Sequence, residues 1–443
     1  MMKAELFLND EATVGKIRGA SLRMEQRGEI EDWLLELTYD AKLFKLFVPR
    51  ELGGLAAGLP EALRVFERAS WADGAYGWLV TIGAGGGFFS AALPELEAAQ
   101  LFSPREAVLA GSGMPTGTAK PVAGGFVVNG RWKFCSGSTF ASFFTANCWI
   151  ERDGANGTGD EPADAGHPAV EGDGAERGEQ YERSAASGRE LRSFAFLPEQ
   201  VEIVRDWNPL GMRATASHSI IVRDAIVPEK LTFDLAAEPR LGHPIYRMPF
   251  LVFAQASFAA VAIGVARHYL EEARAFAELK APEWRAGSPR RLEALLVAIE
   301  AAEARLGEAA ERFYAEAASA WAAFAAGCCA AAGADCDAAE AGRQANCDAA
   351  EAQLQAEAQL QADCGTAVAR RQANCDAAVA RLQADECWAA AARASVDAAE
   401  AARIGAQAVF PLLGMTALLS DHPLSRTWRD LHTVTQHSVL LSL

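Results

Sequence analysis

Residues 111–140, GSGMPTGTAKPVAGGFVVNGRWKFCSGSTF, decide how the middle of the chain folds. Gly124-Gly125 and Asn129-Gly130 are dipeptides typical of tight turns between antiparallel strands. The segments FVV and RWKFCS beside them have the composition of β-strands. We therefore expect antiparallel strands here, with a turn at each dipeptide.

The alternation of side chains along a strand predicts an aromatic wall in RWKFCS. Trp132, Phe134 and Ser136 would share one face, so two rings would be followed by a hydroxyl. The preceding loop, GMPTG, has small side chains that permit close approach. Such a wall suits a flat, partly polar heterocycle, and an ordinary hairpin with one buried face is the alternative.

Composition limits the class of protein. The chain has 443 residues, enough for two or three domains, and 51% of them are hydrophobic. Its net charge is −17, and a nucleic-acid surface needs concentrated positive charge instead. It shows neither a secretory leader nor an unbroken apolar run long enough for a bilayer, so we expect a cytoplasmic protein without a membrane partner. The nine cysteines lack metal-ligand spacing, so we expect free thiols and no metal.

The periodicity changes twice along the chain and divides it into three parts. Residues 1–103 have helical spacing, and 104–235 have the two-residue period of strands, which predicts a barrel or sandwich. Residues 236–443 return to helical spacing. Within the β part, 152–192 is rich in Gly, Asp, Glu and Ala, and we expect a flexible surface insertion there.

The C-terminal part contains a 28-residue tandem repeat over 336–391. RQANCDAAEAQLQA at 343–356 recurs as RQANCDAAVARLQA at 371–384. Twenty-eight residues are four heptads, so equivalent side chains recur on one stripe of a helix. We expect an Ala-rich, lengthened helical hairpin; a dedicated partner-binding coil is the alternative.

The glycines of GAGGGF at 83–88 do not form a dinucleotide-binding loop. Phe88 stands where that fingerprint has its third glycine, and the preceding residues are helical in pattern. We expect a close helix crossing or a kink instead.

Three motifs in this helix–β–helix order resemble the acyl-CoA dehydrogenase superfamily. LFKLFVPRELGGLAAGLPEALRVFERASWADGAYGWL at 43–79 resembles its N-terminal helix–turn–helix. NPLGMRATASHSIIVRDAIVP at 208–228 resembles its G-x-R-x-(S/T)-x-S segment, and HPLSRTWRDLHTVTQHS at 422–438 resembles its R-x-x-R-D helix. The resemblance implies a multidomain α+β fold, a flavin cofactor (FMN or FAD) and a homotetramer.

The dehydrogenases of this superfamily remove a substrate proton with a carboxylate near the R-x-x-R-D motif or in the first C-terminal helix. Here the chain has no Asp or Glu after Asp430, and none occurs in YRMPFLVFAQASFAAVAIG at 246–264. A lost general base costs about 10²–10⁴-fold in rate. Acyl-CoA dehydrogenation by an unrecognised base therefore remains an alternative.

A histidine stands near the expected position of the base. At 100° per residue, a continuing helix would place Arg426, Asp430, Val434 and His437 on one face. The pattern resembles the flavin-dependent two-component monooxygenases of this fold, which receive reduced flavin from a separate reductase and use O₂. That resemblance implies that His437 and Ser136 line the reacting centre and that a small aromatic or heteroaromatic compound is oxygenated.

The resemblance also implies further cofactor contacts. Phe134 and Ser136 would meet the flavin ring, and the remaining candidates are Met114, Thr118, Ser138, Arg213 and Arg426. Structural roles are the alternatives for the arginines, as a strand-end residue or an intrahelical ion pair. A non-catalytic relative that assembles through its helices is the third hypothesis.

Overall fold

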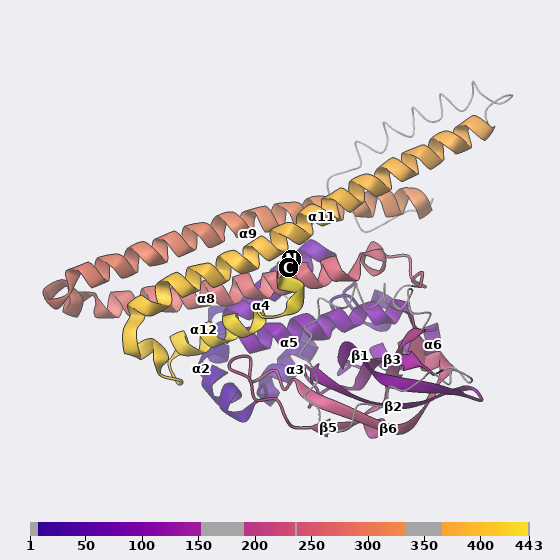
Figure 1. The fold of residues 1–443 in the computed structure, drawn as a ribbon, viewed down its shortest axis with the longest axis horizontal. Coiled ribbons are helices and arrows are strands. Elements are labelled where there is room, and N and C mark those ends of the chain that lie inside the picture. The colour runs from indigo at the N-terminus through magenta and orange to yellow at the C-terminus, as the bar shows by residue number, and fades with distance from the viewer. Residues whose placement is uncertain (1–7, 152–189, 235–236, 333–365, 442–443) are drawn as a thin grey trace, which may run out of the picture.

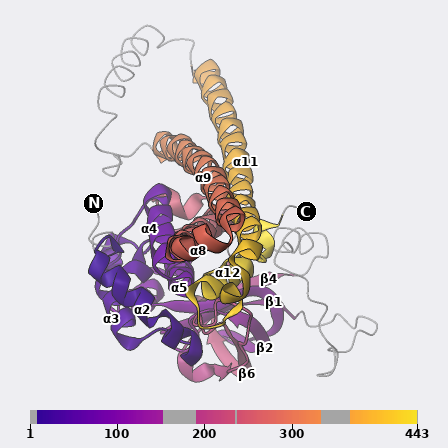
Figure 2. The same cartoon turned by 90° about the vertical axis from the view of Figure 1, so that its left-hand side faces the viewer.

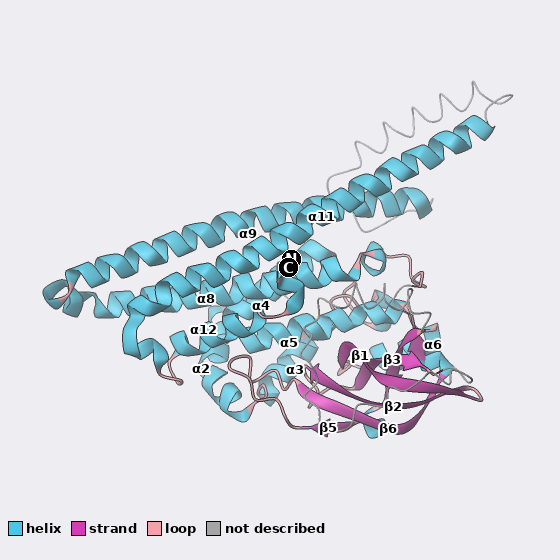
Figure 3. Cartoon of the chain, viewed as in Figure 1, coloured by secondary structure: helices cyan, strands magenta, loops and turns pink. Residues whose placement is uncertain are grey.

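The computed structural model describes residues 8–151, 190–234, 237–332 and 366–441, and helices make up most of it (Figures 1 and 3). The helices before the strands are α2 (Glu11–Arg27), α3 (Asp32–Asp40), α4 (Leu59–Ala72), α5 (Gly74–Gly85) and α6 (Glu95–Phe102). Those after the strands are α8 (Phe250–Gly287), α9 (Pro289–Ala332), α11 (Thr366–Leu413) and α12 (Pro423–Val434).

Part of the expected insertion and part of the repeat fall outside the described residues, namely 152–189 and 333–365. The helix α11 begins at Thr366, so nearly all of the second repeat copy is helical. Figure 2 shows α8 between the α9–α11 pair and the N-terminal helices, with the strands gathered at the opposite side from α9.

The strands form one seven-stranded sheet with the order β5-β6-β2-β1-β3-β4-β7. Its members are β1 (Leu109–Val122), β2 (Gly125–Cys135), β3 (Phe143–Ile150), β4 (Leu191–Phe196), β5 (Glu202–Val204), β6 (His218–Pro228) and β7 (Thr232–Phe233). Only the β1–β3 pair is parallel among these described strands. The buried side chains of one core cluster come from β1, β2, β3, β4 and β6 alone, so the sheet encloses its own core.

The turn predicted at Asn129-Gly130 is wrong, because both residues lie inside β2. The turn predicted at Gly124-Gly125 is confirmed to within one residue, since the β1–β2 hairpin turns at Ala123 and Gly124, where Gly124 has φ +80°. Asn129 donates from Nδ2 to the Asp224 carboxylate at 3.0 Å across a register shift between β2 and β6. A Cβ on Gly130 would lie 2.5 Å from the Trp132 ring, so this glycine serves packing rather than a turn.

The shared face predicted for Trp132, Phe134 and Ser136 is also wrong. Trp132 is fully buried in the sheet core, whereas 61% of Phe134 is exposed. The β2–β6 register shifts between Trp132 and Cys135, and Phe134 has a left-handed φ of +65°. This bulge rotates the strand end, so Phe134 turns outward while Trp132 and Cys135 both point into the core.

The helix α8 is apolar because it is surrounded by other helices. It and the segment Glu386–Leu418 are long and apolar enough to cross a membrane by length and composition alone. In α8, 72% of the apolar window is buried inside the protein, as expected of a core helix. A Cβ on Gly264 of α8 would lie 2.2 Å from the Glu67 carbonyl, which shows how closely α8 crosses α4.

The glycines that follow Ile82 sit at close contacts, which confirms the expected close crossing. A Cβ on Gly83 would lie 2.4 Å from the Phe44 ring, and one on Gly87 would lie 2.9 Å from the Val48 nitrogen. The α-helix also changes to a 3-10 helix at Gly86. Neighbouring side chains and backbone therefore occupy the space beside these glycines.

The helix α12 holds the loop between β5 and β6. A Cβ on Gly211 would lie 2.3 Å from the Arg429 carbonyl carbon, so only glycine permits this approach. Next to it, the Met212 N–H donates to the Asp430 carboxylate. Burial, together with the negative charge of Asp73, raises the pKa of Asp430 to about 7.

Gly130→Ala should destabilise the protein by about 1–3 kcal/mol, because the new methyl group overlaps the Trp132 ring. Gly307→Ala in α9 is the matched control; its Cβ meets nothing within 4 Å, and the higher helix propensity of Ala should stabilise slightly. Urea unfolding checks both changes. Equal stability of the Gly130 variant and the native chain would contradict the packing role.

The raised pKa of Asp430 makes stability pH-dependent. Asp430 binds its proton more tightly in the folded protein than in the unfolded chain. The stabilisation that this protonation gives the folded state is therefore lost as the pH rises through about 7. Between about pH 5 and about pH 8, the free energy of unfolding of the native chain should fall by on the order of 2–3 kcal/mol relative to that of Asp430→Asn. This variant keeps an acceptor for the Met212 N–H. Urea unfolding of both proteins measures the difference; a pH-independent difference would contradict it.

Candidate active site

Ser136 lies just beyond β2 in a buried polar site. Its Oγ accepts a hydrogen bond from Trp78 Nε1 at 2.9 Å and lies 2.7 Å from Ser217 Oγ. Trp78 belongs to α5 and Ser217 precedes β6, so three distant segments of the chain meet at this hydroxyl. Only 6% of Ser136 is exposed.

His437 reaches the same site from the C-terminal end of the described chain. Its ring centroid is 5.9 Å from that of Trp78 and 4.6 Å from that of Phe258 on α8. Both predicted residues, Ser136 and His437, therefore contact the same indole ring, that of Trp78. Trp78, Phe258 and His437 form an aromatic cluster in which the Trp78 and Phe258 centroids are 4.7 Å apart.

The helical position predicted for His437 is wrong. The helix α12 ends at Val434, and His437 caps the following 3-10 helix Ser438–Leu440, where its Nδ1 accepts from the Val439 N–H. The Thr435 hydroxyl bonds back to the Leu431 carbonyl at 2.8 Å, as side chains do that compete with the helix for backbone groups. That Nδ1 contact assigns the proton of a neutral His437 ring to Nε2.

His432 packs away from this site. Its ring stacks on Trp428 at 3.8 Å, and its Nδ1 lies 2.8 Å from the Trp428 carbonyl. Burial lowers its pKa.

Phe134 forms the outer part of the wall near Ser136. Its exposed ring meets Trp207 edge-on, with centroids 6.0 Å apart. Trp207 is held on both sides, because its indole N–H donates to the Met212 carbonyl at 3.0 Å and its backbone N–H donates to His218 Nδ1 at 3.1 Å. The wall is therefore Phe134 and Trp207, rather than Phe134 and Trp132.

A chain of hydroxyl groups continues behind Ser136. Ser217 Oγ lies 2.7 Å from Thr215 Oγ1, which donates to the Met212 carbonyl at 2.8 Å. Met212 and Ala216 both have left-handed φ values, +57° and +46°. Such backbone costs about 1–3 kcal/mol per residue and concentrates at functional sites.

The other β-domain candidates have individual positions. Ser138 donates to the Ala216 carbonyl at 2.7 Å and so lies beside the hydroxyl chain. Met114 lies in β1 where its register to β3 shifts between Ser112 and Gly117. Thr118 is exposed on β1, where it pairs with Asn129 of β2.

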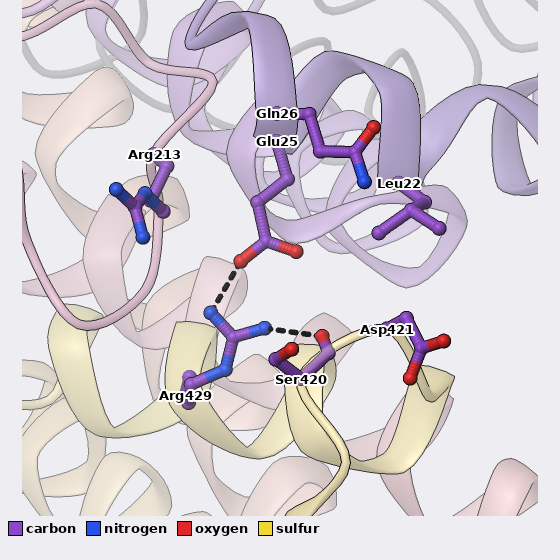
Figure 4. Close-up of a pocket in the computed structure, with 7 residues that line it drawn as sticks. All are labelled: Leu22, Glu25, Gln26, Arg213, Ser420, Asp421 and Arg429. Carbon is purple, nitrogen blue, oxygen red and sulfur yellow. Dashed lines mark hydrogen bonds and ion pairs between the residues drawn. The ribbon is translucent and has the colours of Figure 1, made fainter.

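The two candidate arginines lie in a different place. Arg213 is exposed and lines a cavity of about 280 Å³ between α2 and α12 (Figure 4). Across this cavity, Arg429 pairs with Glu25 and donates to the Ser420 carbonyl at 2.9 Å. Buried Arg426 lines an adjoining cavity together with Asp73 and Asp430. Arg213 and Arg426 thus line cavities bounded by α2 and α12, and Arg213 also donates to Asn208 Oδ1, next to Trp207.

Sequence reasoning missed five residues of the site: Trp78, Trp207, Thr215, Ser217 and Phe258. The first four lie in or directly beside the motifs at 43–79 and 208–228, and Phe258 lies in α8. Polar or aromatic residues within such motifs were the available signal. Their convergence depends on tertiary contacts that no local pattern records.

Comparison with known proteins identifies the fold and the homologues. Residues 328–441 match the family described as "Acyl-CoA dehydrogenase, C-terminal domain". Over 265 residues the chain is 30% identical to indole-3-acetate monooxygenase of Pseudomonas putida, covering 59% of each chain. It is 22% identical to the flavin-dependent monooxygenase oxygenase subunit HsaA of Rhodococcus jostii, covering 58% of this chain and 61% of that one.

The structural match is more extensive than these sequence matches, which span about three fifths of the relatives' length. The crystal structure of 3-HSA hydroxylase from Rhodococcus sp. RHA1 superposes with a TM-score of 0.69 at 20% identity, covering 97% of this chain and 91% of that one. The chain therefore has an acyl-CoA dehydrogenase-like fold, its residues 328–441 match the C-terminal domain model of that family, and flavin-dependent monooxygenases are among its homologues.

Proposed function

We propose that this protein is the oxygenase component of a two-component flavin monooxygenase. It would take reduced flavin, FMN or FAD, from a separate reductase and use O₂ to oxygenate a small aromatic or heteroaromatic compound. The observation that supports this most directly is the meeting of Ser136 and His437 at Trp78. The flavin-dependent homologues point to the same class of reaction.

The side chains near Ser136 fit a flavin ring. Phe134 offers an exposed aromatic surface next to a hydroxyl, which matches a ring that is flat and has nitrogen atoms at its edge. A bound reduced flavin supplies two electrons to O₂, so that one oxygen atom enters the substrate and the other leaves as water. Ser136 would hydrogen-bond the ring edge, and Phe134 would hold the ring by stacking.

The aromatic cluster would bind the substrate and offer it a proton. Trp78 and Phe258 offer faces for a planar compound, and both adjoin His437. Because Nδ1 already accepts from the Val439 N–H, His437 would donate its Nε2 hydrogen to the substrate, as a hydrogen bond or as a general acid. The surrounding rings exclude water from this proton transfer.

Acyl-CoA dehydrogenation needs a carboxylate facing the flavin ring. The Asp430 carboxylate accepts from the Met212 N–H, and the chain Met212–Thr215–Ser217 separates it from Ser136. The described contacts therefore favour an imidazole at the reacting centre. The assembly hypothesis provides no role for the meeting of Ser136 and His437 at one indole.

The other parts of the proposal follow the homologues and the fold. Indole-3-acetate and resorcinol, which occur in the homologues' names, are suitable first substrates because both are small and planar. We further propose a cytoplasmic homotetramer that meets its reductase only through diffusing flavin.

Product labelling tests the proposed reaction. With a flavin reductase, NADH and ¹⁸O₂, the protein should add one ¹⁸O atom to an accepted aromatic compound, detected by mass spectrometry. Omitting the reductase should abolish the product. Bleaching of bound flavin by an acyl-CoA under anaerobic conditions, without labelled product, would contradict the oxygenase function.

His437→Ala should lower product formation by about a hundredfold and leave the Kd for reduced flavin nearly unchanged, because general acid–base catalysis contributes about 10²–10⁴-fold. His432→Ala is the matched control, since this histidine stacks on Trp428 away from the site and should retain native turnover. Steady-state product formation and anaerobic flavin titration measure the two quantities. Native turnover in the His437 variant would remove this residue from the mechanism.

A further inference from the structure

The hydroxyl chain behind Ser136 has a fixed direction, which follows from counting hydrogens. The Met212 carbonyl can only accept, and it receives Thr215 Oγ1 at 2.8 Å, Trp207 Nε1 at 3.0 Å and the Thr215 N–H at 3.2 Å. The single hydroxyl hydrogen of Thr215 is therefore directed to Met212. Thr215 Oγ1 must then accept from Ser217.

The same reasoning extends to Ser136. Because Ser217 donates to Thr215, it has no second hydrogen and must accept from Ser136. Trp78 Nε1 is a donor only, so Ser136 accepts from it. With the opposite direction, the Thr215 and Met212 oxygens would face each other at 2.8 Å with no hydrogen between them.

Ser136 is thus left with one unused lone pair and no hydrogen to offer a ligand. The next two hydroxyl groups are buried, with Ser217 4% and Thr215 1% exposed, so water does not readily reverse the direction of these hydrogen bonds. This matters for a flavin, because N5 of the oxidised ring is a bare acceptor whereas N5 of the reduced ring carries a hydrogen. A lone pair at Ser136 attracts the reduced form and repels the oxidised form.

We propose that Ser217 and Thr215 are positioning residues that fix Ser136 as an acceptor and so make the site select reduced over oxidised flavin. The inference rests on the proposed function, since it concerns the same cofactor. It gives a physical reason for an oxygenase to capture the reduced form from a reductase and to release the ring once it is oxidised. Hydrogen bonds to ring nitrogens are a recognised means by which proteins tune flavins.

Anaerobic titration of the full chain with FMN and FAD, each oxidised and dithionite-reduced, tests this inference. The native protein should bind the reduced form more tightly. In Ser217→Ala, Ser136 can turn its hydrogen toward oxidised N5, so the ratio of the two Kd values should shrink about three- to tenfold, the worth of one hydrogen bond. Thr215→Val should shrink it as well, because Ser217 loses its acceptor.

Two further variants separate positioning from structure. Ser217→Thr keeps the hydroxyl and should restore the native ratio. Ser193→Ala removes an equally buried hydroxyl, bonded to Asn147 in the same sheet, and should leave the ratio unchanged. Circular dichroism confirms that each variant is folded.

The outcomes distinguish this inference from the proposed function. If the native protein binds neither form of either flavin, both are overturned. If it binds flavin but shows no preference for the reduced form, or if Ser217→Ala and Thr215→Val keep the native ratio, the inference alone is overturned. Equal weakening of both redox forms in these variants would also overturn it, because a merely structural role predicts that result.

Discussion

The hydrogen bonds between the end of β2 and residues 212–217 hold the candidate site together. The Gly137 N–H donates to the Thr215 carbonyl at 2.8 Å, the Ser138 hydroxyl bonds Ala216, and Ser136 bonds Ser217. On its other side this segment is tied to α12 through Gly211 and Asp430. These contacts stabilise the left-handed backbone at Met212 and Ala216, which would otherwise be unfavourable.

The arrangement also explains why a helical domain is needed for a site on a sheet. The sheet supplies Phe134 and Ser136, but Trp78 and Phe258 come from α5 and α8. The α12 helix fixes the loop that orients Ser136, and the chain after it carries His437. Residues far apart in sequence therefore meet at one proposed reacting centre, where Trp78 contacts both Ser136 and His437.

Much of the fold was predictable because its motifs are local. The order of helical and strand periodicity and the three motifs led to the acyl-CoA dehydrogenase fold, which the structural match confirms. The predicted alternation of side chains along β2 is wrong at Phe134, because a bulge depends on how β2 pairs with β6 and cannot be read from one strand alone. Asn129-Gly130 failed as a turn because Gly130 is needed against the Trp132 ring, and this contact is formed only after folding.

The site was predictable in part for the same reason. Ser136 and His437 were predicted from motif position, and the structure brings both to Trp78, although His437 lies beyond the helix end rather than on its face. Arg213 and Arg426 were grouped with them because arginine suits phosphate, yet both face cavities near α2 and α12. Trp78 and Ser217 were not predicted, because the sequence around an indole in a helix or a serine before a strand does not indicate which distant residue it will contact.

A crystal structure of the full chain with anaerobically bound reduced flavin would test the central claim most directly. The account predicts the ring against Phe134, with its N5 atom within hydrogen-bond distance of Ser136 Oγ and His437 within one ring's width of it. A ring bound in the cavity beside Arg213 and Arg429, or a carboxylate rather than His437 facing it, would contradict the account.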